Sequence, residues 1–237
     1  MPRLFFLFFL FLLYSCSQSS DAFLQKGKEL MQQGKTREAI DFINKAIEKN
    51  TSNADAFNLR GVAYYELKEF PNALLDFGQA IRLQPASYRP YFNRALLYTD
   101  ENKLDSAFAD YNKSAELAPD TADVFLNRGQ LLVLMDKTTE AIADFEKATK
   151  LDVNNKQAWY NLGNTYYRAA DYKKATLAFR QTVKLDAQYG KAFYGLGLAQ
   201  WNDGEKDLGC TNLKQALKLG YNDAANALAQ FCQEGTR

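Results

Sequence analysis

Residues 58–85, NLRGVAYYELKEFPNALLDFGQAIRLQP, recur as imperfect copies along most of the chain. Comparison of the chain with itself gives a period of 34 residues, with no insertion between successive copies. The six copies begin at Ser20, Ala54, Tyr88, Ala122, Lys156 and Gly190. A period of this length is typical of proteins built from stacked repeats, because one such unit cannot bury its apolar surface alone.

Four places within the period indicate that each copy is a helical hairpin. Small residues occupy the eighth and twentieth places, and large apolar residues occupy the fourth and twenty-fourth. Spacings of three and four put them on one helix face, where small residues let two helices approach and bulky ones fill the remaining space. Breakers such as Gly34, Asn102, Asp136 and Gly204 separate the two expected helices. In chain order, the columns are Phe23, Phe57, Tyr91, Phe125, Trp159 and Phe193 (fourth); Gly27, Gly61, Ala95, Gly129, Gly163 and Gly197 (eighth); Ala39, Ala73, Ala107, Ala141, Ala175 and Gly209 (twentieth); Ile43, Phe77, Tyr111, Phe145, Phe179 and Leu213 (twenty-fourth).

In its period and in these columns the chain resembles the tetratricopeptide repeat over residues 20–223. The resemblance implies an all-α fold, a right-handed superhelical solenoid of six helix-turn-helix repeats with a concave groove. Such an array needs a terminal cap to cover its last apolar face. Gly220 is expected to end the array's last helix and Asn222 to begin another, so residues 222–237 are predicted to form a C-terminal capping helix and tail.

Composition argues against several classes of function. The 29 basic and 28 acidic residues balance, and no basic run could follow a phosphate backbone, so no nucleic-acid partner is expected. The absence of histidine excludes Ser-His-Asp and Cys-His catalysis and all His-ligated metal sites. Three distant cysteines cannot form a zinc cluster. We therefore expect no enzyme activity, cofactor or metal, with a serine–lysine dyad as the one catalytic arrangement left open.

The first residues are predicted to direct the chain out of the cytoplasm. The apolar run at residues 4–14 is too short to span a bilayer and suits a signal peptide covering residues 1–15. Residues 13–16, LYSC, resemble a bacterial lipobox, which implies that Cys16 becomes a lipidated first residue and that residues 16–19 are a short tether. Ser17 after the cysteine favours the outer membrane of the bacterial cell envelope. The alternative is an ordinary secretory leader in which the cysteine is incidental.

Two kinds of side-chain pairing are predicted inside the array. Copies two to four alone carry arginine at the seventh place and aspartate at the twenty-third, where a lone charge would be costly. The expected pairs within each copy are Arg60–Asp76, Arg94–Asp110 and Arg128–Asp144, although pairing with the next copy is also open. Cys210 and Cys232 lie almost equally far from the turn before the capping helix, so they are predicted to form a disulfide. Two buried free cysteines are the alternative.

The first helix of each copy is expected to line the groove and to provide the partner-binding residues. Asn93, Asn127 and Asn161 recur at the sixth place, and such a ladder of amides could pair with an extended peptide backbone. Aromatic residues gather in the later copies, where they could anchor a partner. The alternative is that these residues only support the helix pairs. The predicted groove residues are Phe92, Asn93, Asn127, Gln130, Tyr160, Asn161, Asn164, Tyr167, Arg168, Tyr194 and Trp201.

These features predict a membrane-anchored interaction module that binds a protein or peptide partner in its concave groove at the bacterial envelope. The alternative is a structural subunit of an envelope complex that uses its convex face or edges and leaves the groove empty. Leu24, Leu59 and Leu126 stand where relatives that bind chaperone tails carry parts of a carboxylate clamp, so that specialisation is not expected.

Overall fold

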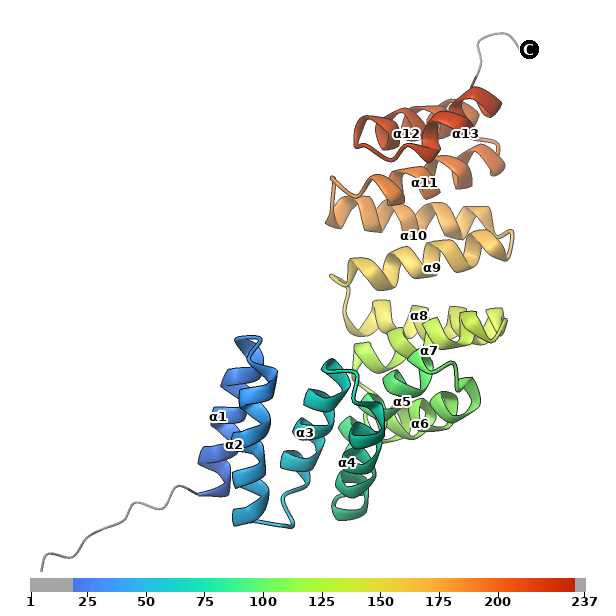
Figure 1. Cartoon of the computed structure of the whole chain (residues 1–237). Helices are drawn as coiled ribbons and strands as arrows, with labels where there is room; N and C mark the ends of the chain where they lie inside the picture. Colours follow the sequence, from blue (N-terminus) through green and yellow to red (C-terminus); the bar gives the residue numbers. More distant parts are fainter. Residues whose placement is uncertain (1–18, 233–237) are drawn as a thin grey trace, which may run out of the picture. The chain divides into compact units, whose positions relative to one another are not determined.

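The computed structural model describes residues 19–232, and these form thirteen α-helices and no strand (Figure 1). The predicted all-α repeat fold is therefore confirmed. The predicted leader, Cys16 and residues 233–237 of the tail lie outside the described residues. The helices are α1 (Ser20–Gln32), α2 (Thr36–Lys49), α3 (Ala54–Glu66), α4 (Phe70–Leu83), α5 (Tyr88–Asp100), α6 (Leu104–Leu117), α7 (Ala122–Leu134), α8 (Thr138–Leu151), α9 (Lys156–Arg168), α10 (Tyr172–Leu185), α11 (Gly190–Asn202), α12 (Lys206–Lys218) and α13 (Asp223–Phe231).

The first helix of every copy begins at the residue where the sequence period begins. The helices fall into two compact units, divided between Leu83 and Gln84. Unit 1 contains α1–α4, drawn in blue to dark teal in Figure 1, and unit 2 contains α5–α13, drawn in green to red. Within each unit, the two helices of a copy pack against each other and the second helix then packs against the first helix of the following copy.

Each hairpin turns through one residue in the left-handed backbone conformation, always at the fifteenth place of the period. In copies one and six this residue is Gly34 or Gly204, with φ of 73° and 91°. Asn102 and Asp136 adopt φ of 57°, which these residue types tolerate better than most. The other two turns use Lys68 and Ala170, with φ of 60° and 58°. These two turn positions were not predicted from the sequence, because lysine and alanine are not typical turn residues.

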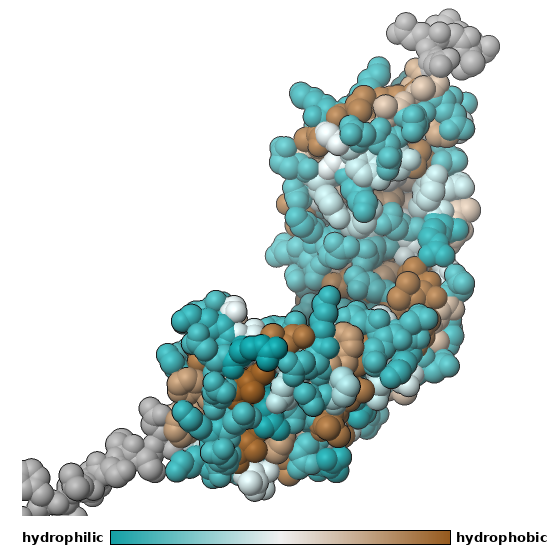
Figure 2. All heavy atoms as spheres, in the orientation of Figure 1, coloured by the Kyte–Doolittle hydropathy of each residue, from teal (hydrophilic) through white to brown (hydrophobic). Residues whose placement is uncertain are grey.

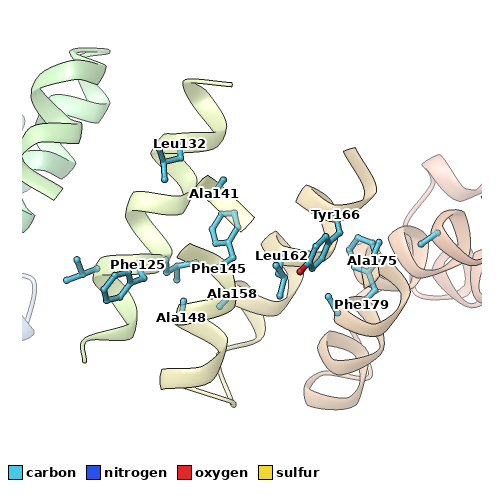
Figure 3. Close-up of a cluster of buried hydrophobic side chains, with 14 of the residues drawn as sticks. Phe125, Leu132, Ala141, Phe145, Ala148, Ala158, Leu162, Tyr166, Ala175 and Phe179 are labelled. Atoms are coloured by element: carbon cyan, nitrogen blue, oxygen red, sulfur yellow. The ribbon is translucent and has the colours of Figure 1, made fainter. Parts of the chain in front are cut away.

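The core of each hairpin is the large residue at the twenty-fourth place. Phe77, Tyr111, Phe145 and Phe179 are at most 1% exposed. Each of the three phenylalanines lies on the second helix of its copy against the glycine at the eighth place of the first helix. A Cβ atom on Gly129 would lie 2.7 Å from the ring of Phe145, so this contact requires glycine or a shift of the ring. Figure 3 shows Phe145 and Phe179 within the continuous apolar cluster of unit 2.

A short helix, α13, covers the end of unit 2. Its buried residues are Ala224 and Ala227, whereas Ala225 and Ala229 are exposed. A disulfide between Cys210 on α12 and Cys232, the residue after α13, joins the two helices, with Cα atoms 5.7 Å apart. The predicted pairing of these cysteines is therefore present in the structure.

Candidate functional site

The first helices of unit 2 line its inner face. Within the described part of this unit, α5 contacts α7, α7 contacts α9, and α9 contacts α11. Successive second helices stand farther apart. The stack therefore curves toward the first helices, and their exposed side chains form the concave surface on which the predicted groove residues lie.

A hollow of about 300 Å³ on this surface lies between α7 and α9. We call it the amide hollow, because amide side chains stand around an apolar floor. Its lining residues are Gln130, Val133, Leu134, Phe145, Asn161, Asn164, Thr165 and Arg168. The structure thus brings together four predicted residues: Gln130, Asn161, Asn164 and Arg168. Leu134 is 60% exposed, so an apolar ligand group placed here would remove apolar surface of the protein from water.

A second hollow of about 210 Å³ lies one repeat earlier, between α5 and α7. It contains two more of the predicted residues, Phe92 and Asn93. We call it the Phe92 hollow. Its lining residues are Tyr88, Arg89, Phe92, Asn93, Thr121, Asp123 and Val124. The two hollows therefore lie between successive pairs of first helices, the Phe92 hollow near the start of its helices and the amide hollow nearer their ends.

The asparagines of the sixth place do not form a uniform ladder. Asn127 donates a hydrogen bond from Nδ2 to the carbonyl oxygen of Asp123, at 2.8 Å. Asn161 instead accepts one at Oδ1 from Nε2 of Gln157, also at 2.8 Å. Among the described residues, the side-chain oxygen of Asn127 and the side-chain NH₂ of Asn161 thus remain available to a ligand. An amide with one end fixed by its own helix is held in a defined orientation.

The predicted tyrosines pack against partners from neighbouring segments. The ring of Tyr160 lies 5.1 Å from that of Tyr189, and Tyr194 lies 5.0 Å from Tyr221, measured between ring centres. Tyr189 and Tyr221 were not predicted, because they lie just before a helix and outside the six groove places of the period. Burial raises the pKa of Tyr189. Burial and a hydrogen bond to Asp223 raise the pKa of Tyr221 to about 12.

Two other predicted residues of the groove are engaged within the chain. The hydroxyl of Tyr167 accepts a hydrogen bond from Nδ2 of Asn202 at 3.2 Å, and burial raises its pKa. The ring of Trp201 lies 4.5 Å from that of Phe231 on the capping helix. Trp201 therefore also contributes to the packing of the cap, and its role in the groove stays a prediction. Sequence alone did not show this, because it did not place Phe231 over α11.

Val133 and Leu134, which line the amide hollow with apolar surface, were not predicted from the sequence. They occupy the twelfth and thirteenth places, both of which point toward the groove in the repeat. Apolar residues are usually buried, but these two lie at places of the period that face the groove. Their positions in the repeat could therefore have identified them as groove residues. Arg168, at the same thirteenth place one copy later, lies 3.5 Å from Asp136, but both side chains are more than half exposed and this ion pair is weak.

The predicted arginine–aspartate pairs form within copies two, three and four. Nε of Arg60, Arg94 and Arg128 lies 2.7 Å from the paired aspartate, and a second hydrogen bond of 2.7–2.8 Å makes each pair bidentate. The aspartate side chains are only 6–9% exposed. The hydrogen bond to the aspartate raises the pKa of Arg60 and of Arg94 despite their desolvation. The pairs tie the two helices of a hairpin together and lie apart from both hollows.

Sequence models of one family match the chain along most of the array. Those described as tetratricopeptide repeat match residues 24–88, 88–121 and 156–189, and one described as TPR repeat matches residues 133–169. The chain carries tetratricopeptide repeats. Proteins of this fold are typically interaction modules without catalytic activity, and none of the curated proteins compared with the chain matches it.

Solved structures of tetratricopeptide repeat proteins are similar to the chain at low sequence identity. The structure described as "Functional Characterization of Pseudomonas Aeruginosa pilF" has a TM-score of 0.77 at 20% identity and covers 88% of this chain and 97% of its own. PilW, described as a widely conserved type IV pilus biogenesis factor, has a TM-score of 0.73 at 19% identity, covering 89% and 98%. YrrB, described as a TPR protein with an unusual peptide-binding site, has a TM-score of 0.70 at 20% identity, covering 78% and 96%. These likenesses support the fold.

Two other kinds of site, a membrane span and a metal site, are absent from the described residues. Within residues 19–232, no helix has the length and apolar character needed to cross a membrane, and no cluster of acidic or cysteine side chains could hold a metal ion. The face in view in Figure 2 is mainly hydrophilic, with apolar residues in separate patches. Specific contact with a partner is therefore best sought at hollows that can receive individual side chains.

Proposed function

We propose that the protein binds an extended segment of a partner protein in the concave groove of unit 2 and holds that partner at the bacterial envelope. The observation that carries the proposal is the amide hollow, in which an exposed apolar floor is surrounded by amide groups and one arginine. An apolar floor gives affinity, and a few fixed polar groups give orientation and specificity. Amides can donate to and accept from a peptide backbone at the same time.

The spacing of the two hollows defines the kind of ligand. Neighbouring packed helices are about 10 Å apart, and an extended chain advances about 3.3 Å per residue. The hollows are also offset by about 9 Å along the helix axes, so a peptide that crosses the first helices obliquely can place one apolar side chain in the Phe92 hollow and another in the amide hollow about four residues away. The exposed guanidinium of Arg168 at the rim favours an acidic group on the partner near the second side chain.

The attachment to the membrane is the second part of the proposal. We infer from the sequence of residues 13–16 that Cys16 is lipidated and that the short tether holds the repeats beside the outer membrane. Metabolic labelling with a palmitate analogue tests this inference in the native host. The wild-type protein is expected to take up the label and Cys16→Ser to lose it. A processed mature form that accumulates normally in the presence of globomycin would overturn the lipoprotein interpretation.

A crosslinking pull-down from the native envelope, followed by binding measurements with the captured partner, tests the groove. The triple variant Gln130→Ala, Asn164→Ala and Arg168→Ala is expected to weaken binding at least about tenfold, because three groups around one hollow are lost. A matched control carries Gln32→Ala, Asn50→Ala and Arg37→Ala, which are exposed residues of unit 1. If the partner binds both triple variants as tightly as the wild type, the groove is not its site and the alternative, a structural subunit that uses its other faces, is favoured.

A further inference from the structure

In copies two to four, the outer side of each hairpin contains a space that is filled by the chain's own guanidinium group. Arg128 lies with its guanidinium carbon 5.4 Å from the ring centre of Phe125, at the fourth place, and pairs with Asp144. It also donates a hydrogen bond to Oδ1 of Asn112, at the twenty-fifth place of the preceding copy, at 2.9 Å. Arg60 makes the same kind of bond to Asn44, at 2.7 Å. Each of these two arginines thus links its own copy to the preceding copy through a hydrogen bond.

Copy five lacks the groups that fill this space. Its seventh place is Leu162 instead of arginine, and its twenty-third place is Ala178 instead of aspartate. Glu146 of copy four stands at the twenty-fifth place and accepts a hydrogen bond from the hydroxyl of Tyr166. Both replacements are shorter than the pair they replace, so the guanidinium space is left open.

The result is a pocket of about 400 Å³ between α8, α9 and α10, which we call the outer pocket. Its lining residues are Glu146, Thr149, Lys150, Val153, Trp159, Leu162, Tyr166, Lys174, Leu177 and Ala178. Leu162 and Tyr166, which are labelled in Figure 3, both come from α9 and line this pocket. Val153 and Leu177 at the rim are 61% and 56% exposed. The wall of the pocket is therefore aromatic and aliphatic, and it continues onto exposed apolar surface.

The outer pocket is a different site from the groove. On α9 it uses Trp159, Leu162 and Tyr166, whereas the amide hollow uses residues such as Asn161 and Asn164. Successive residues of an α-helix are rotated by about 100°, so the two sets project from nearly opposite faces of α9. A ligand in one site does not occupy the other.

The charges at the outer pocket favour an anionic partner. Lys150 is exposed and has no ion pair with any described residue. Lys174 lies over the ring of Tyr166 and 3.2 Å from Asp171, with its side chain 58% exposed. The one acidic group in the lining, Glu146, accepts a hydrogen bond from the hydroxyl of Tyr166, which fixes the position of the carboxylate beside α9. At the rim of an apolar wall, Lys150 is thus the lysine that remains without an acidic partner, while Lys174 is paired with Asp171.

We propose that the outer pocket binds a bulky apolar side chain from an acidic segment of a partner protein. A volume near the lower end of the range for ligand sites suits one or two side chains better than a large cofactor. The apolar side chain would take the space that a guanidinium fills in copies two to four, and a flanking carboxylate would pair with Lys150, with Lys174 nearby. The protein would then have two separate contact surfaces on unit 2, one on each side of α9.

The fluorescence of Trp159 offers a direct test, because the chain has only two tryptophans and Trp201→Phe removes the other signal. The probe is a synthetic peptide with one leucine between two Asp-Glu pairs, titrated into the Trp201→Phe protein. Binding is expected to change the Trp159 emission, and a peptide with lysines in place of the acidic residues is expected to bind at least about tenfold more weakly. An unchanged emission with the acidic peptide at millimolar concentration would overturn the proposal.

Copy four provides a matched variant that fills the pocket. The double variant Leu162→Arg and Ala178→Asp places in copy five the ion pair that Arg128 and Asp144 form in copy four. This variant is therefore expected to fold and to bind the acidic peptide no longer. Lys150→Glu with Lys174→Glu keeps the apolar wall and is expected to reverse the preference toward the lysine peptide. Unchanged binding by the filled variant, or equal affinity of the wild type for acidic, neutral and basic peptides, would show that the pocket does not select this partner.

Discussion

Arg128 on α7 holds Asp144 on α8 through two parallel hydrogen bonds, each 2.7 Å long, although the aspartate side chain is only 7% exposed. The bidentate geometry fixes both side chains and leaves neither carboxylate oxygen without a donor. Copies two and three repeat this arrangement, which makes it part of the architecture of those hairpins and not a feature of one ligand site.

The pair contributes to stability only when both the arginine and the aspartate are present. Arg128→Leu is expected to lower the free energy of unfolding by about 3 kcal/mol, because it leaves the carboxylate of Asp144 buried and unpaired. Arg128→Leu combined with Asp144→Ala, the combination that copy five uses naturally, is expected to cost clearly less. Urea unfolding followed by circular dichroism measures both. Equal losses from the single and double variants would show that the two charges do not depend on each other.

The turn at Ala170 is predicted to carry local strain. Its φ of 58° places a Cβ atom in a conformation that costs an L-residue about 1 kcal/mol, and nothing in an alanine side chain offsets this. Ala170→Gly is expected to raise the thermal midpoint of unfolding, whereas Gly34→Ala, at the same place in copy one, is expected to lower it. Calorimetry on the two variants measures the effect, and shifts in the same direction for both would contradict the account.

Gly209 occupies the twentieth place, where the other five copies have alanine. Replacement by that common residue is nevertheless expected to destabilise the protein, by about 1–3 kcal/mol. A Cβ atom there would lie 2.8 Å from the carbonyl oxygen of Gly197 and 2.9 Å from the backbone nitrogen of Trp201, so α11 and α12 would have to separate. Thermal unfolding tests this directly, and a higher midpoint for Gly209→Ala would show that the helices tolerate the separation.

The fold could be predicted from the sequence because its determinants are local and repeated. Helix starts follow from the period, and the arginine–aspartate pairs follow from two columns that change together. The turns at Lys68 and Ala170 could not be predicted, because the surrounding hairpin imposes their backbone conformation against the preference of the residue. The position of Trp201 could not be predicted either, since it depends on how α13 packs. The outer pocket could not be predicted, because it forms only where α8, α9 and α10 pack together. The sequence does show that copy five has Leu162 and Ala178 where copies two to four have arginine and aspartate.

Alkaline pH is expected to destabilise unit 2. Burial and the hydrogen bond to Asp223 raise the pKa of Tyr221 to about 12, and burial raises the pKa of Tyr167 and Tyr189. The unfolded chain releases these protons near pH 10. The folded state keeps them longer, so the stabilisation is complete below about pH 10 and is lost as the pH rises toward about 12. The thermal midpoint, measured across this interval, is expected to fall less steeply for Tyr221→Phe than for the wild type. Identical slopes would contradict this assignment.

Site-specific photocrosslinking tests the central claim most directly. A photoreactive amino acid at position 164 places the reactive group in the amide hollow, and the same amino acid at position 48, an exposed residue of α2, serves as the control. In the native host, position 164 is expected to give a discrete adduct with a partner protein that position 48 does not give. The adduct is expected to disappear when Gln130→Ala and Arg168→Ala are added. Adducts of equal yield from both positions, or an adduct at 164 that survives the loss of both residues, would contradict a peptide-binding groove.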